Sequence, residues 1–217
     1  MRRLIVLMAI CIASNAIAQS DGASVTINPL SVEGLVVGNS YEFDADFAAE
    51  HNIAVPAPFG FIAPTSDETR IYTQPAPGGT GIFKVHFTTL QDQVKSNLQF
   101  VPMTVTNSSE QAQLDGLQTL LQQAFTASIP NPDRAELSVV QVTHIGPYRA
   151  VEAIGRYDGG ADGIVVLRVV AIPNPEGVDG IVAIINALAN NEPMQEVNDV
   201  LNVDASRALS TFRFLAD

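Results

Sequence analysis

The stretch HIGPYRAVEAIGRYDGGADGIVVLRVV, residues 144–170, decides the fold. It predicts a β-hairpin, in which residues 148–157 and 164–172 are partner strands joined by the loop DGGADG. Aspartate and glycine tolerate the positive φ angles that such a loop requires. The second strand is apolar on both faces apart from Arg168, which is typical of a central strand that is covered on both sides.

The polar residues of this hairpin allow two interpretations. A charge within IVVLRVVAI must be paired or must reach the rim of the sheet, so Arg168 needs a partner, and Glu152 is the candidate. Alternatively, the mixture of histidine, tyrosine and arginine forms a binding or reactive site. Alternation and turn chemistry favour the structural interpretation. The candidate binding or structural cluster consists of His144, Tyr148, Arg149, Glu152, Arg156 and Arg168.

The chain before the hairpin predicts several strands. Strict alternation in SYEFDADF predicts a half-buried strand over residues 40–47, and the prolines of NIAVPAPFGFIAP predict an edge strand that ends in a turn. RIYTQ and GIFKVHFTT, separated by PAPGGTG, predict two antiparallel strands, with His86 solvated on the outward face. The less regular region 91–105 has room for one more short strand.

Two helices are expected. Residues 108–128 form the clearer one, because Ser108 and Gln111 have the spacing of a capping box and four apolar residues recur at helical spacing. AELSVVQVTHI predicts a strand, whereas GIVAIINALA fits a strand or a buried helix equally well. The tail 196–215 predicts a packed C-terminal helix. The apolar face expected for that helix holds Leu201, Ala205, Ala208, Leu209 and Phe212.

Several motifs resemble those of the Mog1/PsbP-like fold group. They are the extended segment VPAPFGF, the hairpin pattern Gly146, Ala150 and Gly155, and the closing LSTFRF. The resemblance covers most of the chain that follows the N-terminal 18 residues. It implies an α+β fold in which an antiparallel β-sheet is packed by helices, as an α/β/α sandwich. It also implies a non-enzymatic accessory or binding protein, and it transfers no functional residue.

The N-terminus predicts export. Arg2 and Arg3, an apolar core over residues 4–12 and the small-x-small pattern of residues 16–18 predict a signal peptide over residues 1–18, cleaved before Gln19. Residues 19–39 are expected to form a loose leader and residues 40–217 a single α+β domain. We therefore expect a periplasmic or secreted protein with no integral membrane segment after cleavage.

Composition and motifs narrow the range of functions that the chain could have. Without Arg2 and Arg3, nine basic residues face 23 acidic ones, a formal charge of −14, which disfavours nucleic acid and anionic membranes as partners. Motifs of serine hydrolases, nucleotide binding and zinc sites are missing, so we expect no catalytic residue, cofactor or metal. The sequence favours a non-enzymatic accessory or binding domain that acts through an unknown protein or envelope component. The alternative is a small-molecule or metal-ion binding protein, conceivably a hydrolase, that uses the acidic loops and His144.

Overall fold

The computed structural model describes residues 28–30, 38–51, 58–64, 69–74, 82–91, 93–105, 109–127, 129 and 134–215. The expected signal peptide, residues 1–18, lies outside these residues, as does most of the expected leader, of which only 28–30 and 38–39 are described. Among the described residues, no helix has the length and apolar character needed to cross a membrane.

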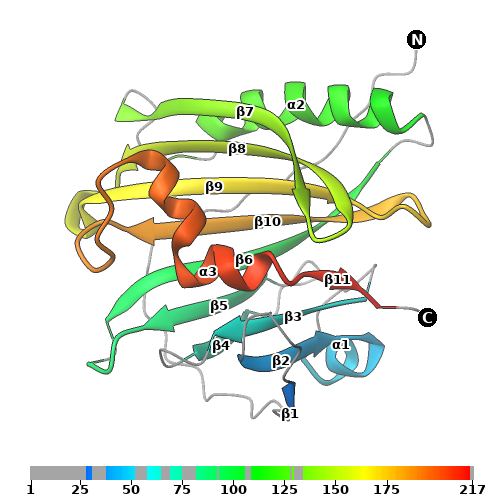
Figure 1. Ribbon diagram of the computed structural model, residues 1–217, viewed down its shortest axis with the longest axis horizontal. Coiled ribbons are helices and arrows are strands. Elements are labelled where there is room, and N and C mark those ends of the chain that lie inside the picture. Colours follow the sequence, from blue (N-terminus) through cyan, green and yellow to red (C-terminus); the bar gives the residue numbers. More distant parts are fainter. Residues whose placement is uncertain are drawn as a thin grey trace.

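The described elements form two antiparallel sheets (Figure 1). The larger sheet has seven described strands in the order β4-β5-β6-β10-β9-β8-β7, and the smaller has four in the order β1-β2-β3-β11. The strands of the large sheet are β4 Thr69–Gln74, β5 Ile82–Thr88, β6 Val94–Thr104, β7 Glu136–Ile145, β8 Tyr148–Asp158, β9 Ile164–Pro173 and β10 Asp179–Leu188. The strands of the small sheet are β1 Asn28–Leu30, β2 Gly38–Phe43, β3 Phe59–Pro64 and β11 Arg213–Phe214.

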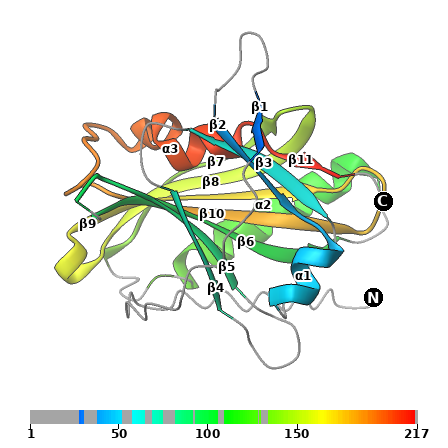
Figure 2. The same ribbon diagram turned by 90° about the horizontal axis from the view of Figure 1, so that it is seen from below.

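Helices cover both faces of the large sheet, as Figures 1 and 2 show. Helix α2, Glu110–Ala127, packs over β7, β8 and β9 on one face. The other face carries the small sheet, the helix α3, Asp204–Leu209, and the 3-10 helix η3, Val197–Asn202. The short helix α1, Ala45–His51, follows β2, and the 3-10 turn η2, Gly160–Asp162, lies between β8 and β9. This arrangement confirms the expected α+β fold with an antiparallel sheet packed by helices.

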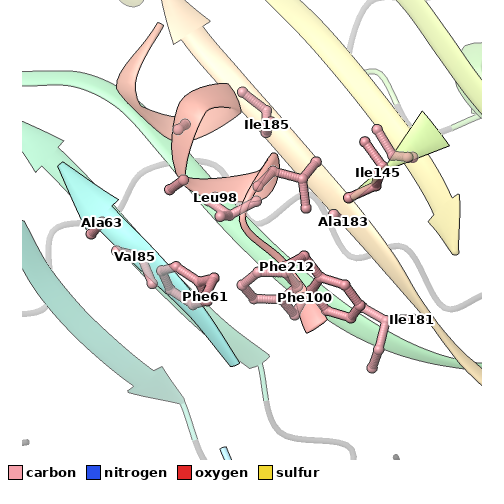
Figure 3. Packing of buried hydrophobic residues seen from close by; sticks show 14 of the residues in the cluster. Phe61, Ala63, Val85, Leu98, Phe100, Ile145, Ile181, Ala183, Ile185 and Phe212 are labelled. Atoms are coloured by element: carbon pink, nitrogen blue, oxygen red, sulfur yellow. The ribbon is translucent and has the colours of Figure 1, made fainter. Parts of the chain in front are cut away.

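Two hydrophobic cores hold the layers together. The core between the two sheets is rich in aromatic side chains. It contains Phe61 of β3, Phe100 of β6 and Phe212, which follows α3 (Figure 3). The ring centroids of Phe61 and Phe100 are 5.4 Å apart, and those of Phe100 and Phe212 are 6.2 Å apart. The second core lies under α2. The predicted apolar stripe of this helix is confirmed, since Leu114, Leu117, Leu121 and Phe125 are all buried.

The hairpin of residues 144–170 is confirmed. β8 pairs with β9 in antiparallel register, and the loop uses positive φ angles at Gly160 (69°) and Gly163 (72°). β9 is buried along most of its length. Gly155 is needed for close packing of helix on sheet, because a Cβ there would lie 2.2 Å from the Glu136 carbonyl oxygen and 2.5 Å from the Phe125 ring.

Two predictions near the start of the described chain are wrong, and a third, which is confirmed as a strand, underestimated its length. The strand expected over residues 40–47 ends at Phe43, because Asp44 caps a helix instead: its Oδ1 accepts a hydrogen bond of 2.9 Å from the Phe47 N–H. β3 is not an edge strand, since β11 returns from the C-terminus to pair with its first two residues. The short strand expected within 91–105 is β6, which has eleven residues and lies near the middle of the sheet.

The helix predictions also need correction. Ser108 lies outside the described residues, and Ser109 makes the capping contact, with its Oγ 3.4 Å from the Ala112 N–H nitrogen. The Gln111 side chain donates a 2.8 Å hydrogen bond from Nε2 to Asp115 Oδ1. GIVAIINALA is part of strand β10. The expected C-terminal helix is divided into η3, α3 and β11, and Leu201 is exposed, because η3 precedes α3 instead of continuing it.

Candidate functional site

The structure divides the predicted polar cluster between the two faces of the large sheet. Alternation along β8 places Tyr148 and Glu152 on the face of the small sheet, with Ala150 and Ile154, and Arg168 of β9 shares this face with Val166 and Val170. Arg149 points to the opposite face, where it forms an ion pair with Glu110 of α2. His144, opposite Arg149 in the β7–β8 register, is exposed. The six residues therefore do not converge on one site.

Arg168 and Glu152 form the buried ion pair that the sequence suggested. Two guanidinium nitrogens of Arg168, Nε and Nη2, donate to Glu152 Oε2 at 2.9 and 2.8 Å, and the two side chains are 7% and 3% exposed. The second carboxylate oxygen accepts a 2.7 Å hydrogen bond from Gln141 on β7. Since η3 packs over β8 and β9, which carry the two residues, the fold encloses the pair.

The remaining members of the cluster also have structural contacts. The Arg156 guanidinium lies 2.7 Å from the Glu136 carboxylate on the neighbouring strand. The hydroxyl of Tyr148 accepts a 3.0 Å hydrogen bond from the Phe214 N–H, and its ring packs edge-on against Phe212 and Phe214. These contacts join β8 to the neighbouring strand β7 and to the C-terminal strand β11.

The acidic loops have turn geometry. Asp158 Oδ1 accepts a 2.9 Å hydrogen bond from the Gly160 N–H, and Oδ2 binds Arg134; these contacts hold the pKa of the Asp158 carboxyl below its usual value. In the β9–β10 turn, the Glu176 N–H donates to the side chain of Asn174 at 3.0 Å. Within the described residues, no three His, Cys, Asp or Glu side chains are grouped as a metal site would need.

A different group of polar side chains lies on the α2 face of the large sheet, on β5, β6 and β10 and near the end of β8. The central member is Asn186 of β10: its Nδ2 donates to Asn97 Oδ1 of β6 at 3.2 Å, and its Oδ1 accepts from the Tyr157 hydroxyl of β8 at 3.3 Å. In the register of β5 and β6, His86 is opposite Asn97 and Lys84 is opposite Gln99. We call this group the polar face. Its members are Lys84, His86, Asn97, Gln99, Tyr157 and Asn186.

Burial and electrostatics distinguish the polar face from an ordinary solvated surface. Asn97 and Gln99 are each 4% exposed, and Lys84, His86 and Asn186 are half-buried. Burial, helped by the charge of Lys84, lowers the pKa of His86 to about 4, so its imidazole is neutral at pH 7. Burial also lowers the pKa of Lys84. His86 was predicted to be solvated on the outward face of its strand, and the structure corrects this, because the side chain is half-buried.

The polar face can exchange hydrogen bonds in both directions. Each amide offers a carbonyl acceptor and two N–H donors, and a neutral imidazole offers one of each. Burial raises the pKa of the Tyr157 hydroxyl, with a further contribution from Asp162, so that hydroxyl keeps its proton at neutral pH. The sequence signals were Asn97 and Gln99 alternating with apolar residues, and Asn186 interrupting the run of β10. These amides meet on one surface only because β6 pairs with β10, and no local sequence pattern predicts that pairing.

Comparisons with known proteins find similarity in structure only. No family model and no curated protein sequence matches the chain. The solution structure of cyanobacterial PsbP (CyanoP) from Synechocystis sp. PCC 6803 aligns with 85% of this chain and 98% of its own, with a TM-score of 0.50 and 11% identity. LpqN of Mycobacterium tuberculosis, described as involved in cell envelope biogenesis, aligns with 82% of this chain and 91% of its own (TM-score 0.46, 13% identity).

A crystal structure from Bacteroides thetaiotaomicron VPI-5482 aligns with 73% of this chain at a TM-score of 0.45 and 9% identity, and this chain spans only 46% of that protein. At these identities the similarity concerns the fold and no residue's role. The resemblance to the Mog1/PsbP-like fold group is thus confirmed as a shared fold, and the chain has the fold of cyanobacterial PsbP.

Proposed function

We propose that the protein is an exported, non-enzymatic binding domain that acts through a protein or envelope partner, and that it contacts this partner with the polar face. The observation that carries the proposal is the hydrogen-bonded series Tyr157, Asn186 and Asn97, which crosses the part of the sheet beside α2. A buried amide costs free energy unless it is hydrogen-bonded, and this series meets that requirement on a sheet face that could hold valine or leucine instead.

The chemistry of the polar face suits recognition of a polar, uncharged surface. Amide and imidazole groups pair with backbone or hydroxyl groups of a partner, and a site built to make such hydrogen bonds strongly rejects surfaces that lack them. The two half-buried side chains of β5, Lys84 and His86, flank the buried Asn97 and Gln99 of β6, so a partner would meet the polar face through its half-buried members. A partner would add contacts to groups that the fold already holds in place, so little ordering would be required on binding.

The proposed export and domain organisation rest on the sequence. Residues 1–18 have the charge, apolar length and small residues of a cleaved signal peptide. The formal charge of −14 that remains keeps copies of the protein apart and opposes binding to anionic lipid surfaces. We infer that residues 40–217 form one α+β domain, because the strands of the large sheet come from 69–188 and the C-terminal β11 pairs back with β3.

The test is capture of cross-linked partners by the tagged, exported protein from its native envelope, compared among three variants. Asn97→Ala combined with Asn186→Ala removes both members of a hydrogen-bonded pair, so neither amide is left without the other. Gln122→Ala on the exposed side of α2 is the matched control. Thermal melting checks that each variant is folded.

We expect the wild type and the control to capture the same partner, and the double variant to capture about tenfold less, as expected for losing one or two good hydrogen bonds. Equal capture by all three variants would exclude the polar face as the contact surface. Failure of the wild type to capture any specific partner would contradict the proposed function itself.

A further inference from the structure

Within the part of the chain that the structure describes, the outer edge of β7 has no strand beside it, and its composition is unusual. Among the described residues, β7 has one hydrogen-bonded neighbour, β8, and so it ends the large sheet. Natural proteins protect such edges with lysine, proline or bulges. The chain has 23 acidic and 11 basic residues, yet residues 137–145 hold no Lys, Arg, Asp, Glu or Pro. A register shift between Leu137 and Val139 disturbs the start of the strand and leaves the rest regular.

The β7–β8 turn determines which backbone groups face outward. Ile145 pairs with Tyr148 across a two-residue turn in which Gly146 has a φ of 55°, as a type II′ turn requires at its first central position. In such a hairpin the closing pair exchanges its hydrogen bonds, and residues alternate from there along the ladder. Ile145, Thr143 and Gln141 therefore bond to β8. The N–H and C=O groups of His144, Val142 and Val140 point away from the sheet.

We propose that this edge pairs with the same edge of a second copy of the chain, antiparallel about a two-fold axis at Val142. Val142 then faces its own copy, and Val140 faces His144 of the other copy, so that all the outward groups of this segment find partners. The residues between them also match: Gln141 faces Thr143, two side chains that can hydrogen-bond. Val139 faces Ile145, an apolar pair. Such a self-complementary contact is what a two-fold dimer requires.

The position of α2 is compatible with this pairing. Helix α2 packs mainly over β8 and β7, so its axis lies over these two strands. Strands in a sheet are about 4.8 Å apart, and pairing of two β7 strands would place the two α2 helices about 10 Å apart, which is the spacing of packed helices. Val140 and Val142, which are half-buried against the α2 core, would be buried further by the second copy.

The test measures the mass of the exported protein by sedimentation over a concentration series, with two variants at one position. His144→Pro removes an outward N–H that β8 does not use, and the exposed histidine side chain leaves the core unchanged. His144→Ala keeps the N–H and is the matched control. We expect a dimer for the wild type and for His144→Ala. For His144→Pro we expect a dissociation constant about thirtyfold higher, the effect of losing two hydrogen bonds per dimer.

A covalent test is independent of the proline variant's folding. In a Cys11→Ser background, Val142→Cys should form a disulfide-linked dimer on mild oxidation, since opposed residues of a hydrogen-bonded pair have Cα atoms about 5.5 Å apart. Glu176→Cys, in the exposed β9–β10 turn and away from β7, should form no disulfide-linked dimer under the same oxidation. A wild type that is monomeric throughout the series, a His144→Pro dimer as stable as the wild type, or equal cross-linking of both cysteine variants would overturn the proposal.

Discussion

The buried Arg168–Glu152 pair predicts a large and asymmetric response to substitution. Arg168→Met removes the cation that donates two hydrogen bonds to Glu152 Oε2, and it leaves a 3% exposed carboxylate with Gln141 as its remaining partner. Breaking one side of a buried ion pair typically costs about 3–5 kcal/mol of unfolding free energy. For a protein of this size, that corresponds to a fall in Tm of about 6–20 °C.

Removing both charges should restore most of the loss. In the double variant Arg168→Met with Glu152→Leu, no unpaired charge remains under η3, so we expect an unfolding free energy within about 1 kcal/mol of the wild type. The matched surface control is Arg156→Met, whose ion pair with Glu136 joins two side chains that are each more than half exposed. That control should cost less than about 1 kcal/mol.

The assay is urea unfolding at pH 7, followed by circular dichroism. It compares the wild type, Arg168→Met, the surface control Arg156→Met and the double variant. A loss below about 1 kcal/mol for Arg168→Met would show that the pair is hydrated. A double variant as unstable as the single one would show that the arginine stabilises the sheet by packing rather than by pairing.

Three further predictions concern packing, protonation and processing. Gly155→Ala should lower Tm sharply, because the new Cβ would collide with the β7 backbone and the Phe125 ring. Gly116→Ala, on the exposed side of α2, meets nothing within 4 Å and should stabilise the protein by up to about 1 kcal/mol. Thermal melting of the two variants compares these effects. The pKa of His86 is lowered to about 4 in the folded protein, so the unfolded chain binds more protons between pH 6.5 and 4. Stability should fall as pH decreases through that window, by at most about 3 kcal/mol, and His86→Gln should flatten the fall in urea titrations; an unchanged slope would contradict the buried imidazole. The intact mass of the exported protein should correspond to a chain beginning at Gln19, and a mass that includes residues 1–18 would contradict the predicted cleavage.

Patterns within one segment predicted much of the fold. The hairpin of β8 and β9 followed from alternation and a glycine-rich loop, and α2 followed from its leucines and Phe125. The strand predicted over residues 40–47 was wrong because Ala45 and Phe47 continue the strand alternation, whereas the chain begins a helix there, capped by Asp44 Oδ1, which accepts a hydrogen bond from the Phe47 N–H. The Arg168–Glu152 pair could be suggested, since both residues belong to one hairpin, but the strand register was needed to establish it.

Features that depend on distant segments could not be predicted in the same way. β3 became an internal strand through pairing with residues about 150 positions later, where the Ile62 N–H also donates to Thr211 Oγ1. The polar face depends on β6 and β10 being neighbours. Asn97 and Gln99 of β6 and Asn186 of β10 are ordinary amides in two distant segments, and only the sheet order brings them onto one surface with His86.

The most direct test of the proposed function observes the side-chain amide groups of the polar face by NMR while the captured partner is added. The NH₂ resonances of Asn97 and Asn186 are expected to shift, together with the imidazole signals of His86, while the NH₂ group of Gln122 on α2 stays unchanged. Binding that shifts other resonances and leaves Asn97 and Asn186 unaffected would contradict the account.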